Sequence, residues 1–103
     1  MNYNEKIEKM IADAGLVAPR ITEANIKNKI ADVSYTTLPS GKVMVCEITL
    51  INGFTVRGEA AVVSIANFRE NIGREISYRN AFDKIWELEG YLLQERLFNE
   101  ANT

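Results

Sequence analysis

Apolar residues recur at a helical spacing in three parts of the chain. Residues 4–14 and 22–31 have apolar side chains three or four positions apart and predict two short helices, capped by Asn4 and Thr22. Residues 71–98 have apolar side chains at about every third or fourth position and predict one long helix. The pattern therefore predicts helices at both ends of the chain.

Between these helices the apolar residues alternate with others. Residues 33–38, 43–51 and 54–60 have this period of two, which predicts strands. The pair Asn52-Gly53 lies between the last two, and both residue types tolerate the positive φ of a type I′ turn. A two-residue hairpin is therefore expected to join residues 43–51 to 54–60.

The predicted turn determines which side chains share a face of the sheet. In this register Ile51 lies opposite Phe54, and Thr49 lies opposite Val56. One face then carries Val43, Val45, Thr49, Ile51, Phe54, Val56 and Ala60. The other carries Met44, Cys46, Ile48 and Leu50 beside Thr55, Arg57 and Glu59. Because apolar residues lie on both faces, both need a cover, from helices and from a second subunit.

The long predicted helix also carries more than one apolar stripe. The first stripe is Ile72, Ile76, Phe82, Trp86, Gly90, Leu93 and Leu97. The second is Tyr78, Ala81, Ile85, Leu88 and Leu92. One small sheet cannot bury both stripes, which again predicts a homo-oligomer.

These elements predict an α+β fold: two short N-terminal helices, a small antiparallel β-hairpin or meander, and one long C-terminal helix. The 103 residues have room for a single domain. Its parts are the N-terminal helices in 1–31, the β-hairpin region in 33–60 and the C-terminal helical region in 64–98. We expect this domain to assemble into a compact homo-oligomer.

The composition excludes several classes of protein. A net charge of −2 argues against general binding to long nucleic acid, which needs clustered Lys and Arg. No apolar run approaches the roughly 20 residues of a membrane span, and the polar start lacks the features of a signal peptide. We therefore expect a cytoplasmic protein with no membrane partner.

The sequence contains little that suggests catalysis. It has no His, the usual base at neutral pH and the commonest metal ligand. The single Cys46 lies in an apolar strand and is expected to be a packed residue. We therefore expect no catalytic residues, no metal site and no cofactor.

The basic residues are more informative by position than by number. Arg20 and Lys27 flank the second predicted helix, and Arg69, Arg74, Arg79 and Lys84 lie in or near the first half of the long one. Singly, each is an ordinary surface cation. In a symmetric oligomer, one Arg per subunit becomes two or three around an axis, which could hold a small polyanion. Tyr35 and Thr36 could add a stacking surface and a hydroxyl group.

Several segments of the chain form a distinctive combination: NGFTVRGEA within residues 45–60, SIANF at 64–68 and NIGREISYRNAFDKIWELEGYLLQERL at 71–97. The segments APRIT at 18–22 and YTTLPSGK at 35–42 add to it. In these segments most of the chain from about residue 18 onward resembles a small family of tailed-phage proteins. The family includes anti-CBASS proteins, which act as sponges for cyclic oligonucleotides. CBASS is a bacterial immune system in which a cyclase makes cyclic nucleotides that activate a cell-killing effector.

The resemblance implies a protein that binds cyclic di- and trinucleotides without cleaving them, in the cytoplasm of the infected bacterium. It also implies a homohexamer of two interlocked trimers. Cyclic dinucleotide pockets would lie between subunits near the N-terminal helices, and cyclic trinucleotide pockets where three subunits meet.

Site residues can be assigned from this resemblance. It places Arg20, Lys27 and Tyr35 around the dinucleotide pocket, and Thr36, Arg74 and Arg79 at the trinucleotide pocket. The family pocket also uses an aromatic residue of the first helix, where this chain offers only Tyr3.

Two other functions are considered. A phage oligomeric adaptor that binds and inhibits a host protein would suit the acidic charge and the apolar strands equally well. A nucleic-acid-binding regulator is disfavoured by the net charge and by the lack of a basic helix.

Overall fold

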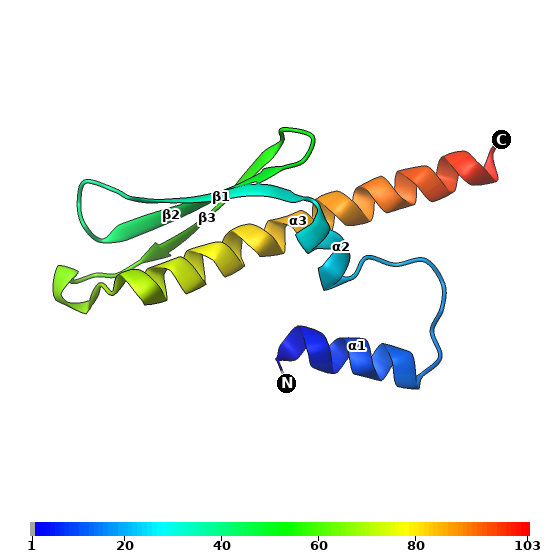
Figure 1. The fold of residues 1–103 in the computed structure, drawn as a ribbon, viewed down its shortest axis with the longest axis horizontal. Helices are drawn as coiled ribbons and strands as arrows, with labels where there is room; N and C mark the ends of the chain where they lie inside the picture. The colour runs from blue at the N-terminus through cyan, green and yellow to red at the C-terminus, as the bar shows by residue number, and fades with distance from the viewer. Residues whose placement is uncertain (1) are drawn as a thin grey trace.

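The computed structural model describes residues 2–103 and confirms the α+β fold (Figure 1). Two short helices precede three strands, and one long helix follows them. The elements are α1 (Tyr3–Asp13), α2 (Glu23–Asn28), β1 (Ile30–Thr37), β2 (Val43–Leu50), β3 (Thr55–Ala61), a 3₁₀ turn η1 (Ile65–Asn67) and α3 (Glu70–Ala101). The predicted boundaries are off by a few residues: β1 begins at residue 30, inside the region assigned to the N-terminal helices, and α3 extends beyond residue 98.

The cap predicted for α1 is wrong, and the one predicted for α2 is confirmed. The side chain of Asn2, two residues before Asn4, accepts a hydrogen bond from the Glu5 backbone N–H at 2.7 Å. Thr22 and Asn25 form a reciprocal capping box, with hydrogen bonds of 3.1 and 2.9 Å between side chain and backbone. The helix after Thr22 ends at Asn28, earlier than predicted, because the next residues pair with β2.

The three strands form an antiparallel sheet in the order β1-β2-β3. The hairpin between β2 and β3 differs from the prediction. Thr49 pairs with Thr55, and the Leu50 N–H donates to the Phe54 carbonyl at 2.8 Å, so the loop holds three residues, 51–53. Gly53 alone in it has a positive φ, 91°. The loop is therefore a turn followed by a left-handed glycine, instead of a type I′ turn.

This one-residue change in register corrects the predicted faces. The buried face of the hairpin consists of Met44, Cys46, Ile48 and Leu50 from β2 and Val56, Gly58 and Ala60 from β3. The opposite face is more polar than predicted, and there Arg57 lies 3.5 Å from Glu47 on the neighbouring strand. A register in which Val56 shares a face with Ile48 gathers the apolar residues on one side.

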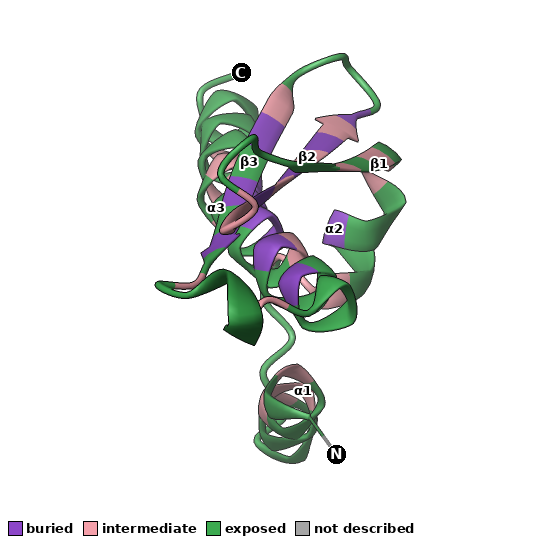
Figure 2. Cartoon of the chain, turned by 90° about the vertical axis from the view of Figure 1, so that its left-hand side faces the viewer, coloured by how far each residue is buried: buried purple, intermediate pink, exposed green. Residues whose placement is uncertain are grey.

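Helix α3 covers the apolar face of the sheet, as Figure 1 shows. Its buried residues follow neither predicted stripe alone: Ala81 and Ile85 belong to the second and Phe82 to the first, while Gly73, Ser77 and Glu89 belong to neither. Ile72 and Ile76 of the first stripe are exposed. Figure 2 shows the buried residues gathered where α2, the strands and α3 meet. The core there consists of Ile26, Cys46, Ile48, Leu50, Val56, Ala81, Phe82 and Ile85.

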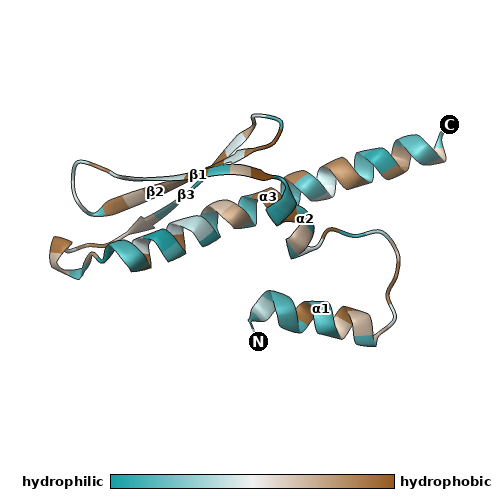
Figure 3. Cartoon of the chain, viewed as in Figure 1, coloured by the Kyte–Doolittle hydropathy of each residue, from teal (hydrophilic) through white to brown (hydrophobic). Residues whose placement is uncertain are grey.

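Two parts of the chain extend away from this core. The last turns of α3 continue past the sheet, and α1 lies apart from it, with none of residues 3–13 buried (Figure 1). Apolar residues nevertheless occur along both segments, as Figure 3 shows. The radius of gyration is 16.9 Å, whereas a compact domain of this length has about 13 Å. No helix within residues 2–103 is long and apolar enough to cross a membrane.

Candidate ligand-binding site

A large hollow lies between α1, the segment before α2, and α3. Its volume is about 800 Å³. Helix α1 supplies one wall, because residues four positions apart share a helix face, and α3 supplies the opposite wall in the same way. The lining residues are Tyr3, Asn4, Ile7, Glu8, Ile11, Arg20, Ile21, Arg79, Asp83 and Trp86. The cavity thus combines two aromatic rings, an aliphatic floor and two arginines.

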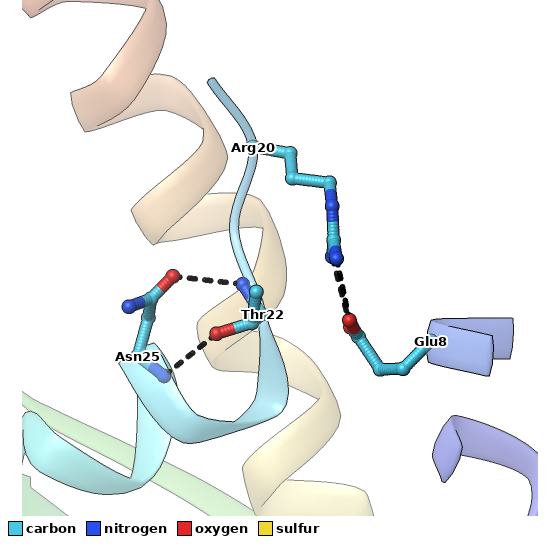
Figure 4. Close-up of polar contacts among 4 residues, drawn as sticks. All are labelled: Glu8, Arg20, Thr22 and Asn25. Atoms are coloured by element: carbon cyan, nitrogen blue, oxygen red, sulfur yellow. Dashed lines mark hydrogen bonds and ion pairs between the residues drawn. The ribbon is translucent and has the colours of Figure 1, made fainter. Parts of the chain in front are cut away.

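Arg20, one of the predicted site residues, is held by Glu8 of α1 (Figure 4). Its two terminal nitrogens donate to the two carboxylate oxygens at 2.9 and 2.6 Å. Both side chains are about one-third exposed, at 34% and 35%. The hydrogen bond from Arg20 and the attraction of its charge lower the pKa of Glu8, with burial acting in the opposite direction. Glu8 is therefore a carboxylate at neutral pH, and it neutralises the arginine.

Arg79 reaches two hollows at once. It lines the large cavity, and it also lines a smaller one of about 240 Å³ together with Lys27 and Tyr78. Its guanidinium lies 3.9 Å from Asp83, and the Lys27 ammonium lies 3.4 Å from Glu23. Both cations are more than half exposed. They are therefore available to an anion that enters from the surface.

Tyr35 and Arg74 lie side by side, although the sequence-based assignment puts them in separate pockets. The Arg74 guanidinium carbon is 5.0 Å from the centre of the Tyr35 ring, which is the geometry of a cation–π contact. Arg74 also pairs with Glu70 at 2.8 Å. Burial raises the pKa of Tyr35, and Cys46 and Tyr78 add to the rise, while Arg74 opposes it. Tyr35 is thus a neutral phenol at physiological pH.

Thr36 lies on the other face of the sheet. It pairs with Val45 next to Tyr35 on β1, and successive strand residues point to opposite sides. Since α3 covers the side of Tyr35, one chain does not bring Thr36 together with Arg74. A site that uses both residues would need more than one copy of the chain.

Several residues of the large cavity are not among those predicted from the sequence. Glu8, Asp83 and Trp86 are not among the predicted site residues, and Tyr3 enters only through the resemblance. The four-residue spacing of Tyr3, Ile7 and Ile11 could have indicated a common wall. Nothing local in the sequence indicates that Glu8 pairs with a residue twelve positions further on.

A second hollow is mainly apolar. It has a volume of about 530 Å³ and lies between the β2–β3 loop and the distal part of α3. Ile51, Phe54, Tyr91 and Leu92 line it and are more than half exposed. We call these four residues the apolar groove. Within residues 2–103, no group of three or more His, Cys, Asp or Glu side chains comes close enough to hold a metal ion.

Fold and site define a small α+β protein with ion-paired arginines around an aromatic-lined cavity. The chain belongs to the Phage protein (N4 Gp49/phage Sf6 gene 66) family, whose model matches residues 21–97. The match spans α2, the whole sheet and all but the last turn of α3. Helix α1, with Tyr3 and Glu8, lies outside it. No curated protein and no solved structure matches the chain.

Proposed function

We propose that this phage protein sequesters the cyclic di- and trinucleotide messengers of CBASS immunity without cleaving them. The observation that carries the proposal is the cavity of about 800 Å³, where Arg20 and Arg79 lie with Tyr3 and Trp86. Arginine binds phosphate through paired hydrogen bonds, and aromatic rings stack on bases. The volume is within the range of about 300–1,000 Å³ typical of small-molecule sites. Membership of a phage protein family and the resemblance to anti-CBASS sponges support the same function.

The two ligand classes would use different residues. For cyclic dinucleotides we propose Arg20, Lys27 and Tyr35, of which Arg20 lines the large cavity. Lys27 lines the adjoining hollow, which shares Arg79 with that cavity. The bound ligand would thus extend along the outer face of α2.

For cyclic trinucleotides we propose Thr36, Arg74 and Arg79 from several subunits. Arg74 is held above Tyr35 and is about half exposed, so its guanidinium is oriented yet accessible. Repetition around a threefold axis would present three such cations to three phosphates. Because Thr36 lies on the far face of the sheet, a neighbouring subunit would supply it.

The proposed assembly is a homohexamer in the cytoplasm of the infected bacterium. Its support is the shape of the chain. The radius of gyration of 16.9 Å, the detached α1 and the distal turns of α3 leave apolar residues uncovered, including Met10, Leu16, Val17 and Phe98. Other copies of the same chain are present wherever the protein is made, and they would cover these apolar residues.

The alternative, an adaptor that inhibits a host protein, is favoured by the apolar groove. Its four exposed side chains resemble the apolar centre of a protein interface. The two functions differ in one observable. A sponge takes up cyclic nucleotide and returns it chemically unchanged on denaturation, whereas the adaptor takes up none.

Two arginine variants test the residue assignment. Arg74→Ala removes one cation from each subunit, and thus three charge-assisted hydrogen bonds from a threefold pocket, each worth about 1.5–3 kcal/mol. Calorimetric titration should therefore show a loss of several orders of magnitude in affinity for cyclic tri-AMP. Arg20→Ala should weaken cyclic dinucleotides and leave cyclic tri-AMP unaffected.

The two variants serve as controls for each other, because each keeps the arginine that the other lacks. Full-strength binding of cyclic tri-AMP by the Arg74→Ala protein would overturn the assignment of that residue. Equal losses for both ligand classes in either variant would contradict separate pockets.

A further inference from the structure

Within residues 2–103, the side chains of helix α1 make one polar contact with the residues that follow the helix. None of residues 3–13 is buried, and the following residues Leu16 and Val17 are exposed. The pair between Glu8 and Arg20 is the contact that spans this gap, as Figure 4 shows. Glu8 therefore helps to hold α1 over the cavity.

The geometry of this pair matches the geometry of phosphate recognition. Both terminal nitrogens of Arg20 donate to one carboxylate, in a parallel pair of hydrogen bonds. A phosphodiester presents two unesterified oxygens in a similar arrangement and would bind the same edge of a guanidinium. A carboxylate and a phosphate cannot both occupy that edge.

We propose that Glu8 is an internal competitor for Arg20, which an incoming phosphodiester must displace. In the free protein Glu8 occupies and neutralises the arginine and holds α1 over the cavity. In the bound protein the phosphate takes this edge, and α1 loses its polar contact. Glu8 thereby limits the affinity of the cavity for anionic ligands. The inference rests on the function proposed above, since it assumes a nucleotide phosphate as the ligand.

The direct test is Glu8→Gln in the full-length protein. Glutamine keeps the size of the side chain and removes its charge, so Arg20 loses its ionic partner. We expect the affinity for cyclic di-AMP and cyclic di-GMP to rise by up to about fivefold, the upper end of the range for loss of a partly exposed ion pair. The matched control is Asp13→Asn, which makes the same change of charge on the same helix. Asp13 pairs with Lys9 and not with Arg20, so the affinity should stay at the wild-type value.

A second measurement follows the position of α1 without any ligand. Hydrogen exchange of the α1 amides should be faster in Glu8→Gln than in the wild type or in Asp13→Asn.

The outcomes separate the two proposals. If wild type and Glu8→Gln both bind no cyclic nucleotide, the proposed function fails, and the competitor role fails with it. If the wild type binds and Glu8→Gln binds equally or more weakly, the competitor role alone is wrong. Binding by Glu8→Gln that exceeds wild-type binding, with Asp13→Asn unchanged, supports it.

Discussion

Gly53 determines the conformation of the loop between β2 and β3. Its φ of 91° is a conformation that side chains with a Cβ rarely adopt, and its N–H donates to the Leu50 carbonyl at 2.8 Å. The dipeptide Asn52-Gly53 correctly predicts a hairpin here. It does not decide between a two-residue and a three-residue loop, since Asn-Gly suits both. The choice depends on tertiary packing, which places Val56 over the core and Arg57 beside Glu47.

The first prediction concerns this residue. Gly53→Val should lower the stability by about 1–3 kcal/mol, because a β-branched side chain is strained at positive φ. Among residues 2–103, no atom outside the immediate chain neighbours lies within 4 Å of the new Cβ, so crowding does not contribute. Thermal unfolding measures the loss. Gly53→Asn is the control, and its loss should be smaller, since Asn tolerates this conformation better. An unchanged melting temperature for Gly53→Val would contradict the described loop.

Only some residues of the candidate site could be predicted from the sequence. Arg20 and Arg79 are recognisable from the sequence as cations near helices, and the structure places both at one cavity. The carboxylates that pair with them lie at very different distances along the sequence. Asp83 lies one helical turn from Arg79, a spacing that the sequence shows, whereas Glu8 meets Arg20 only through the course of the chain between α1 and α2.

At the scale of elements, the packing of α3 on the sheet depends on Gly58. A Cβ at this position would overlap the backbone N of Ala81 and the backbone O of Ser77. The side chain of Asn80 adds a hydrogen bond to the Glu59 carbonyl, at 2.7 Å. The helix therefore lies against the backbone of β3 at this point. A glycine in a strand can signal such a close approach, but the partner depends on the tertiary fold.

The second prediction follows from this contact. Gly58→Ala should destabilise the protein by about 3 kcal/mol, since the added methyl group meets backbone atoms that cannot rotate away. Chemical denaturation measures this change. Gly90→Ala on α3 is the control, because no atom of residues 2–103 outside its own helix turn lies within 4 Å of its Cβ. It should stabilise an isolated chain by about 0.5–1 kcal/mol. Gly58→Ala of wild-type stability would show that α3 does not lie this close to β3.

Helix caps and strand periods predicted the order and type of the elements well, because they depend on neighbouring residues. Thr22 and the alternation from Val43 onward are examples. The buried side of α3 was harder to predict, because it follows neither of the two apolar stripes. It runs through Ser77 as well as Ala81 and Ile85, where small residues allow close packing. Ile72 and Ile76 stay exposed on the single chain.

The whole molecule is more extended than a compact domain of the same length. It measures 55 × 32 × 19 Å; α3 runs along the long axis with its distal part at one end, and α1 extends the molecule across that axis (Figure 1). The exposed apolar residues on these segments leave surface that assembly would bury. The residues that meet in a pocket between subunits depend on the symmetry of the assembly. One sequence therefore does not predict such a pocket in detail.

The third prediction is the mass in solution. Light scattering at micromolar concentration should give six times the chain mass of 11.6 kDa. Replacement of the exposed Phe54 of the apolar groove by Ser should leave the fold unchanged and test whether that groove takes part in assembly. A mass of 11.6 kDa for the wild type would rule out the proposed hexamer.

Sequestration of cyclic nucleotides without cleavage is tested most directly by uptake and recovery of ligand. The purified protein is mixed with a panel of cyclic di-AMP, cyclic di-GMP and cyclic tri-AMP and separated from free nucleotide. It is then denatured, and the released nucleotide is identified by mass spectrometry. A sponge should retain at least one of these ligands at micromolar concentration, and the ligand should be recovered intact. Recovery of linear or hydrolysed products, or no retention of any of the three ligands, would contradict sequestration without cleavage.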